Sequence, residues 1–424
     1  MRSLFRFSRY SQLNHGQDSA FEADFTRTSG PANMPSPIRF ILDTDMGGGA
    51  CRDVDDVVAL CISHALMDNG EAELLAVVQD TAPPPCAGAI SVINHWYGRD
   101  HIPIGAYKGS GLTQTGKPPL TYVDSLVRNF PSPIKNSTQV PDAVEVYRAA
   151  LAASPARSVV IASVGLQTNL DLLLRSVPDE HSPLTGYQLV AEKVVLLASM
   201  AGNYPRSRWP ECNACGCFNE VDAASKATAA AASSYVAANV PPSVGIIYLG
   251  FDDGDRVRSG AILETCTVQA NPCRHALMDF RDRAGWGWGP GGRSSYDPLT
   301  VLLAVRGVSR EGMGMSKCVD CDGVNYIDAA DGNNHWVVGP RSNQSYVVLQ
   351  DKATAQRALD ELLCQPRLAD RPTEWSSAII TTLALAAFTL GAVATVRALR
   401  RRCSTSKFRA RELGYAREVT DPDL

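Results

Sequence analysis

The sequence predicts an α/β fold with a mostly parallel central sheet and helices on both faces. Short apolar runs alternate with helical stretches, and the runs are apolar enough for strands that are buried on both sides. The chain has 424 residues with ordinary apolar content, which suffices for one large domain or two. Strands and helices that alternate at this spacing are typical of parallel βα units.

The first strand is predicted from "IRFILDTD", Ile38 to Asp45. A helix follows over Asp53 to Gly70, because acidic residues occupy its first turn and Asn69-Gly70 gives a stop signal. The later predicted elements are strand 73–80, helix 86–98, strand 102–105, strand 158–165, helix 167–175, strand 192–200, helix 221–240, strand 243–250 and helix 297–307.

Charge and cysteine content limit the partners and the compartment. The net charge of -4 gives no indication of nucleic-acid binding. Several of the 12 cysteines are clustered, namely Cys212, Cys215, Cys217, Cys266, Cys273, Cys318 and Cys321. The spacing leaves a structural zinc site and disulfides both open, and it favours disulfides in an oxidising compartment. The sequons at Asn136 and Asn343 agree with such a compartment.

The two ends of the chain carry further expectations. Residues 1–37 are polar and are predicted to form a flexible leader. After a linker over 367–374, residues 375–396 contain no charged side chain and are predicted to form one transmembrane helix. The basic segment 397–424 would then be cytoplasmic, and the main domain luminal or extracellular. Since residues 1–37 contain no clear secretory signal, a tail-anchored protein with a cytosolic domain is the alternative.

Five carboxylates are concentrated near the first strand: Asp43, Asp45, Asp53, Asp55 and Asp56. Asp43 and Asp45 share a face at the carboxyl end of the strand, which is where ligands of parallel sheets bind. Helix capping would account for one or two of these residues, but carboxylates this close together repel one another. A hard cation would relieve that repulsion, and the surplus of carboxylates favours Ca²⁺ over Mg²⁺.

This acidic stretch resembles the signature of the inosine-uridine nucleoside hydrolase family, with "DTD" at Asp43–Asp45 and "DVDD" at Asp53–Asp56. The gap between them is longer than in the family, so an insertion lies around Gly48 to Arg52. Three later segments also match, in the right order, and the resemblance spans Ile38 to Pro366. These segments are "SVGLQTNLDLLL" at 163–174, "MAGNYP" with "PECN" at 200–213, and "SSYDPLTVLLAVRG" at 294–307.

The resemblance implies roles for individual residues. Asp45 would be the catalytic base and a calcium ligand, and the other ligands would be Asp56, Asp297 and the backbone carbonyl of Val164. Ribose hydroxyl groups would contact Asp55, Glu211 and Asn213, with Asn219 as a competing alignment for Asn213, and Asp43 would support the loop from behind. The implied activity is Ca²⁺-dependent hydrolysis of ribonucleosides to base and ribose, and dimers or tetramers are common in the family.

Three departures from the family bear on activity. Tyr296 stands where many members have the histidine that precedes the last aspartate, and a phenol is a poorer acid at neutral pH. Gln79 and Asp80 replace the usual ribose-contacting Gly-Asn. Trp286 and Trp288, in "GWGWGPGG", are candidates for stacking on a purine. The alternatives are therefore a protein that binds ribose-containing ligands without cleaving them, or a hydrolase of another ribosyl compound.

Overall fold

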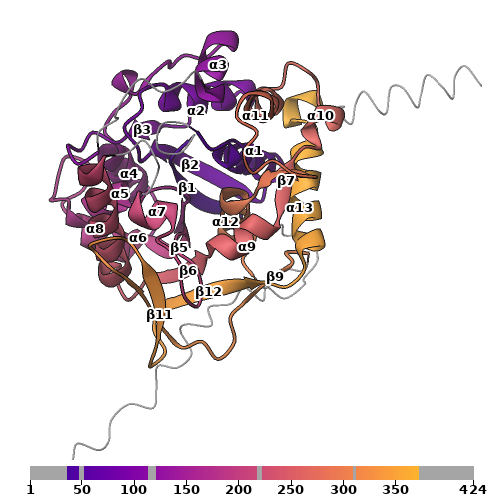
Figure 1. Ribbon diagram of the computed structural model, residues 1–424. Coiled ribbons are helices and arrows are strands. Elements are labelled where there is room, and N and C mark those ends of the chain that lie inside the picture. Colours follow the sequence, from indigo (N-terminus) through magenta and orange to yellow (C-terminus); the bar gives the residue numbers. More distant parts are fainter. Residues whose placement is uncertain (1–35, 47–51, 113–120, 217–221, 309–311, 372–424) are drawn as a thin grey trace, which may run out of the picture. The chain divides into compact units, whose positions relative to one another are not determined.

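The computed structural model describes residues 36–46, 52–112, 121–216, 222–308 and 312–371. Its main feature is an eight-stranded sheet in the order β3-β2-β1-β4-β5-β6-β12-β9, in which every neighbouring pair is parallel except β12 and β9 (Figure 1). The strands are β1 (Ile38–Thr44), β2 (Ala72–Gln79), β3 (Ile104–Ala106), β4 (Val159–Ser163), β5 (Val194–Met200), β6 (Gly245–Leu249), β9 (Met315–Lys317) and β12 (Gln344–Leu349). The predicted mostly parallel sheet is therefore confirmed.

Helices cover both faces of this sheet (Figure 1). On one face lie α1 (Asp55–Asp68), α2 (Pro85–Trp96), α3 (Tyr122–Asn129), α11 (Pro272–Arg283), α12 (Tyr296–Arg306) and α13 (Lys352–Cys364). On the other lie α4 (Ala143–Ala152), α5 (Thr168–Arg175), α6 (Gly186–Lys193) and α8 (Ala223–Asn239). Shorter helices are α7 (Cys212–Cys215), α9 (Phe251–Arg256) and α10 (Leu263–Cys266).

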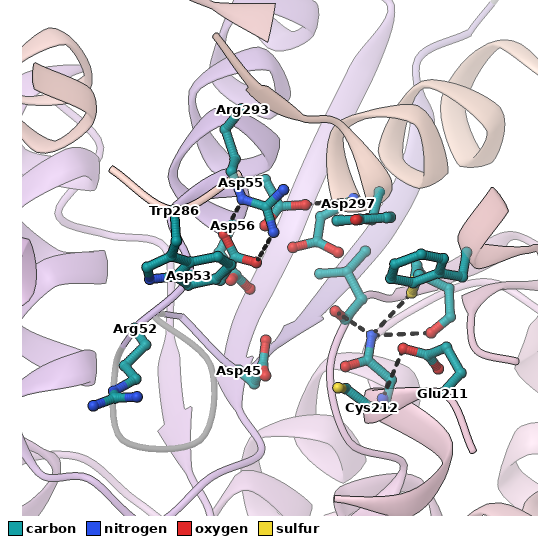
Figure 2. Close-up of a pocket in the computed structure, with 15 residues that line it drawn as sticks. Asp45, Arg52, Asp53, Asp55, Asp56, Glu211, Cys212, Trp286, Arg293 and Asp297 are labelled. Atoms are coloured by element: carbon teal, nitrogen blue, oxygen red, sulfur yellow. Dashed lines mark hydrogen bonds and ion pairs between the residues drawn. The ribbon is translucent and has the colours of Figure 1, made fainter. Parts of the chain in front are cut away.

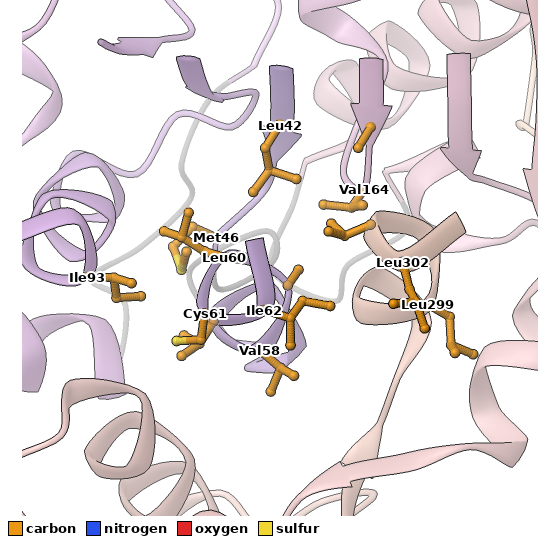
Figure 3. Close-up of a cluster of buried hydrophobic side chains, with 14 of the residues drawn as sticks. Leu42, Met46, Val58, Leu60, Cys61, Ile62, Ile93, Val164, Leu299 and Leu302 are labelled. Carbon is orange, nitrogen blue, oxygen red and sulfur yellow. The ribbon is translucent and has the colours of Figure 1, made fainter. Parts of the chain in front are cut away.

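The residues of β1 show how the sheet divides the core. Phe40 and Leu42 belong to the apolar cluster of the α1 face, and Ile41 between them belongs to the cluster of the opposite face. Such alternation is required because successive side chains of a strand point to opposite sides. Figure 3 shows Leu42 facing apolar side chains of α1 and α12, including Ile62 and Leu299. Burying each of these large side chains contributes about 1.5–3 kcal/mol to folding.

Several elements were not expected from the sequence. Helices α3, α4, α6, α11 and α13 are among them, as are two small antiparallel sheets that lie apart from the main one. One sheet pairs β7 (Arg258–Gly260) with β8 (Gly292–Ser294), and the other pairs β10 (Gly323–Ile327) with β11 (Asn334–Val338). β7 and β8 have three residues each, which is too short for a period to be recognised in the sequence.

Disulfides join elements that are distant in sequence. Cys61 of α1 is bonded to Cys273 of α11, and Cys266 of α10 is bonded to Cys364 of α13. Cys318 and Cys321 are bonded to each other, so this Cys-x-x-Cys pair forms a disulfide and not half of a zinc site. Cys86 and Cys215 are also disulfide-bonded, whereas Cys212 has a free thiol. Of the two alternatives left open by the sequence, the structure supports disulfides.

The chain divides into two units, Met1–Gln365 and Pro366–Leu424. Of the second unit the structure describes only residues 366–371, which contain the short helix η2 (Leu368–Asp370). Within the described ranges, no helix has both the length and the apolar character needed to cross a membrane. The described residues do not include the predicted leader up to residue 35, residues 48–51 of the insertion, the transmembrane segment 375–396 or the basic tail 397–424.

Candidate active site

A cavity of about 520 Å³ opens beyond the carboxyl ends of the central strands. Asp45, which directly follows β1, lies in its wall (Figure 2). This is the edge at which parallel α/β sheets bind ligands, because the loops that follow the strands converge there. The lining residues are Asp45, Arg52, Asp53, Asp55, Asp56, Val164, Met200, Glu211, Cys212, Asn213, Phe251, Trp286, Arg293, Tyr296 and Asp297.

Three buried carboxylates converge in this cavity. Asp45 follows β1, Asp56 is the second residue of α1 and Asp297 is the second residue of α12. Each offers one carboxylate oxygen, and these three oxygens lie within 4.8 Å of one another. Two of the three therefore lie at helix N-termini, whose dipoles favour negative charge.

The electrostatics of this triad suit a cation. Burial, and then repulsion by neighbouring aspartates, raises the pKa of Asp45 and of Asp297 well above the ordinary range. A divalent cation held by oxygen ligands would offset this repulsion and restore the charged forms. The donor set of Asp45, Asp56 and Asp297 is all oxygen, so it fits a hard ion such as Ca²⁺ or Mg²⁺.

Val164 lines the same cavity at the carboxyl end of β4, as the predicted fourth ligand should. Its carbonyl accepts a hydrogen bond from Nδ2 of Asn213 at 2.9 Å. Gly165 follows, and a Cβ at that position would come within 2.5 Å of the Asp45 backbone nitrogen and within 2.3 Å of Oδ2 of Asp80. Only glycine therefore allows this loop to approach the strand end that carries Asp45.

Asp55 and Asp53 extend the acidic wall. The backbone N–H of Asp297 donates to Oδ2 of Asp55 at 3.3 Å, which joins the starts of α1 and α12. Burial and the neighbouring Asp53 raise the pKa of Asp55, while Arg293 opposes this shift. Asp53 itself accepts two hydrogen bonds from Arg293, from Nε at 3.0 Å and from Nη2 at 2.8 Å.

Asp43 lies behind this wall and does not line the cavity. Its carboxylate accepts hydrogen bonds from the hydroxyl of Tyr147 at 2.8 Å and from Nδ2 of Asn169 at 3.0 Å. Burial raises the pKa of Asp43 to about 7, although these two hydrogen bonds act in the opposite direction. The residue thus ties β1 to α4 and α5.

Gln79 and Asp80 are also fully buried and are not among the lining residues. Nε2 of Gln79 donates to the carbonyl groups of Thr81 and Pro83, at 2.7 and 2.8 Å. Asp80 packs against Gly165 behind Asp45. Gln79 therefore holds the loop after β2, and neither residue lies where it could contact a ligand in the cavity directly.

Glu211 and Asn213 line the cavity, but both also bind the backbone of its wall. Glu211 caps α7 by accepting from the N–H groups of Asn213 at 3.0 Å and Ala214 at 3.3 Å, and it accepts from Gly202 at 2.9 Å. Burial raises its pKa to about 7, although these backbone donors act against the shift. The competing candidate Asn219 lies outside the described residues.

Aromatic side chains form the remaining wall. Tyr296 stacks on Phe251 with ring centroids 5.0 Å apart, and its hydroxyl donates to Oδ1 of Asp255 at 3.1 Å. Burial raises the pKa of Tyr296 well above its ordinary value. Trp286 lines the cavity, whereas Trp288 packs against the apolar core and is not a lining residue. Of the two candidate tryptophans, only Trp286 therefore lies where it could contact a ligand in the cavity.

Four lining residues were not predicted from the sequence: Arg293, Phe251, Met200 and Arg52. The sequence does contain a signal for Arg293, because this residue lies four positions before Asp297, between Gly291-Gly292 and the start of α12. The other three carry no pattern of their own in the sequence.

Comparison with known proteins supports the fold. No protein-family model and no curated protein matches the sequence. Among solved structures, the chain is similar to the purine-preferring ribonucleoside hydrolase from Gardnerella vaginalis, with a TM-score of 0.53, 16% identity, and coverage of 77% of this chain and 99% of that one. It is similar to an inosine-guanosine nucleoside hydrolase at a TM-score of 0.54 and 14% identity, with coverage of 77% and 98%.

A third similar structure is the type III effector protein XopQ complexed with adenosine diphosphate ribose, at a TM-score of 0.51 and 17% identity, with coverage of 77% and 94%. The fold of this chain is therefore nucleoside hydrolase-like, and a buried cluster of aspartates that could hold a metal ion lies at its candidate site. The comparisons do not indicate a preference for inosine and uridine.

Proposed function

We propose that this protein hydrolyses the N-glycosidic bond of ribonucleosides to free base and ribose, with Ca²⁺ bound at Asp45, Asp56, Asp297 and the carbonyl of Val164. The observation that carries the proposal is the convergence of three buried carboxylate oxygens within 4.8 Å, in a cavity at the ligand-binding edge of the sheet. The similar structures named as ribonucleoside hydrolases support the same reaction class.

The reaction needs a water activated below C1′, a fixed ribose and some relief of charge on the departing base. A Ca²⁺ ion bound at the triad would lower the pKa of a water and orient it with a ribose diol. Asp45 accepts the proton of that water, and Asp55 accepts a hydrogen bond from a ribose hydroxyl. Glu211 and Asn213, which also line the cavity, would contact further hydroxyl groups of the ribose.

Purine nucleosides are the substrates that the aromatic wall fits best. Trp286 offers a flat ring system on the cavity surface, on which the face of a purine can stack. Two of the similar structures are a purine-preferring ribonucleoside hydrolase and an inosine-guanosine nucleoside hydrolase, which agrees with this preference.

The deciding experiment uses the full chain, purified with Ca²⁺ and then treated with a chelator. Ribonucleosides with different bases are incubated with each form, and free ribose is assayed. Ribose released only in the presence of Ca²⁺ is the expected result. No release from any nucleoside, with or without Ca²⁺, would contradict the proposal.

A second candidate is a protein that binds a ribose-containing ligand without cleaving it. Tyr296 favours this alternative, because its hydroxyl is engaged by Asp255 and its raised pKa makes it a poor acid. A third is hydrolysis of another ribosyl compound, which agrees with the adenosine diphosphate ribose in one similar structure. Calcium-dependent thermal stabilisation by ribose or adenosine diphosphate ribose, without release of ribose, would favour the binding protein.

We also propose that the hydrolase domain lies in an oxidising compartment, luminal or extracellular, and is anchored by residues 375–396. The disulfides between α1 and α11 and between α10 and α13 support this location. Glycosidase treatment of the protein from eukaryotic cells tests it, since glycans at Asn136 or Asn343 require exposure to the lumen. An unchanged mass, matching that of the N136Q/N343Q variant, would favour the tail-anchored alternative.

A further inference from the structure

Arg293 is held rigidly over the cavity by the small β7–β8 sheet. It pairs with Ser259 of β7, and the preceding Gly292 has a φ of +118°. A Cβ on Gly292 would come within 1.9 Å of the Ser259 carbonyl oxygen, so a side chain there would force the two strands apart. The backbone that carries Arg293 is thus fixed by a close approach that only glycine permits.

The guanidinium group is fixed as well. Nε and Nη2 bind the two carboxylate oxygens of Asp53, and the side chain is only 7% exposed. Its central carbon lies 4.7 Å from the ring centroid of Trp286 (Figure 2) and 5.3 Å from that of Tyr296. Nη1 meets no acceptor within hydrogen-bond distance among the described residues. An oriented cation with a free donor therefore lies between the two aromatic rings.

The position of the base follows from the walls of the cavity. The metal triad and Asp55 would hold the ribose, and a planar base must then extend toward a surface that can cover its face. The aromatic wall, with Phe251, Trp286 and Tyr296, is that surface. Arg293 lies within this wall and close enough to Asp55 to affect the pKa of its carboxyl. A base seated there would meet the edge of the guanidinium.

Bond cleavage places charge on the base. When the C1′–N bond breaks, its electron pair stays on the base nitrogen, so the base leaves as an anion unless an acid protonates it. No histidine lines the cavity in the described part of the chain, and Tyr296 already donates its proton to Asp255. Glu211 also lines the cavity with a pKa of about 7, but its carboxylate oxygens accept hydrogen bonds from backbone N–H groups of the wall. The aromatic wall thus offers no available acid, while it contains a cation with a donor that faces no acceptor among the described residues.

We propose that Arg293 is a catalytic residue that stabilises the departing base as an anion, through charge and hydrogen bonding, in place of a general acid. This inference rests on the proposed hydrolysis and specifies its leaving-group step. The water oxygen forms a bond to C1′ as the C1′–N bond breaks, and Asp45 takes the water proton. The base anion stays paired with Arg293 and takes a proton from solvent. An arginine suits this role because its guanidinium remains charged at all physiological pH values.

The test compares two leaving groups in wild type and in R293M. Inosine has a base that is a poor leaving group, whereas p-nitrophenyl β-D-ribofuranoside releases a stable anion. If Arg293 stabilises the leaving anion, R293M should lower kcat for inosine by about 10²–10³, the loss typical for removal of one charge-stabilising donor. The loss for the nitrophenyl riboside should be far smaller. Added guanidinium ion, or R293K, should recover part of the inosine rate.

D53N is the matched control, because it removes the partner of the guanidinium but keeps the cation. A purely structural role for Arg293 predicts that R293M and D53N slow both substrates by equal factors, and that result would overturn the inference. Thermal unfolding identifies a variant that fails to fold, and R293Q, which also removes the charge, then replaces R293M in the same comparison. If wild type cleaves neither substrate with Ca²⁺ present, the proposed hydrolysis fails. If it cleaves both and R293M leaves their ratio unchanged, only the role of Arg293 fails.

Discussion

Asp45 and Glu211 are both buried carboxylates on the cavity wall, and they meet different partners. Asp45 faces other carboxylates, so its charge has to be offset by something that enters the cavity. Glu211 faces backbone N–H groups, which occupy its oxygens and fix the loop before α7. The same chemical group thus faces like charges in one place and backbone hydrogen-bond donors in the other.

Asp45→Asn keeps the volume of the side chain and removes its ability to take a proton. We expect ribose release to fall by about 10²–10⁴, the usual contribution of a general base. Asp331→Asn, at an exposed acid in the β10–β11 turn, is the control and should retain the wild-type rate. Equal rates for wild type and D45N would remove Asp45 from the mechanism.

The two tryptophans of the glycine-rich loop should behave differently. Trp286→Ala removes a cavity wall and should slow cleavage of purine nucleosides more than that of pyrimidine nucleosides, because stacking depends on the size of the base. Trp288→Ala removes core packing and should lower the melting temperature while keeping the purine-to-pyrimidine ratio. Steady-state rates on both nucleoside classes test this, and equal losses for all bases in W286A would exclude a stacking role.

Glu211 should make the stability of the metal-free protein depend on pH. Its pKa rises from an ordinary 4.5 to about 7 on folding, mainly because of burial. Its contribution to stability is therefore complete below pH 4.5 and is lost as the pH rises through about 7, at roughly 1.4 kcal/mol for each pH unit in between. Thermal unfolding of wild type and E211Q from pH 4.5 to 8 measures this. The stability of wild type should fall relative to E211Q as pH rises, and parallel curves would show that Glu211 keeps an ordinary pKa.

At the level of secondary-structure elements, the site depends on where strands end and helices begin. β1 ends one residue before Asp45, while α1 and α12 both start with an acidic first turn that points at the same space. The N–H of Asp297 bound to Asp55 joins the two helix starts directly. Any change in the packing of α12 against α1 would therefore alter the spacing of the three carboxylate oxygens.

Disulfides fix several helices of this face, and their effects should scale with the loop that each one closes. Cys266 and Cys364 are 98 residues apart, so C266S/C364S should lower the free energy of unfolding by about 2–5 kcal/mol. Cys318 and Cys321 are three residues apart, and C318S/C321S should cost clearly less because a short loop has little entropy to lose. Urea unfolding of both double variants tests the order, and a larger loss in C318S/C321S would contradict it.

At the scale of the whole molecule, the binding of a cation should be linked to the stability of the fold. The triad draws on residues more than 240 positions apart in sequence, so the site forms only when the sheet and both helices are assembled. An ion bound to the folded state alone stabilises it by about 2.7 kcal/mol at a concentration one hundred times its dissociation constant.

Removal of the metal should therefore lower the melting temperature. Chelated wild type should melt several degrees lower than the Ca²⁺-loaded protein, and D297N should lose this difference while D331N keeps it. The calcium effect should be larger at pH 8 than at pH 5, because raised pKa values keep Asp45 and Asp297 protonated at the lower pH. If the melting temperature of wild type does not change with Ca²⁺, this would argue against a metal at the triad.

The sequence by itself determined the parallel sheet and the acidic edge. Strands such as Ile38–Thr44 are short apolar runs without the periodicity of a helix. Asp45 and Asp56 can be recognised as candidate ligands because one follows a strand and the other lies at the start of a helix. These signals are local, so they can be read from neighbouring residues. The same local pattern also predicted the position of Asp297, through its resemblance to a known segment.

Only the tertiary structure decided which side chains share the cavity. Arg293 reaches the cavity because β8 pairs with β7. Trp286 lines the cavity, whereas Trp288, two residues later, packs against the core. Likewise Gln79 and Asp80 lie at the carboxyl end of a central strand, as expected for ligand contacts, yet neither lines the cavity. Contacts between residues far apart in sequence decide which short strands pair and where loop side chains point. The spacing of apolar residues along the chain therefore does not predict either feature.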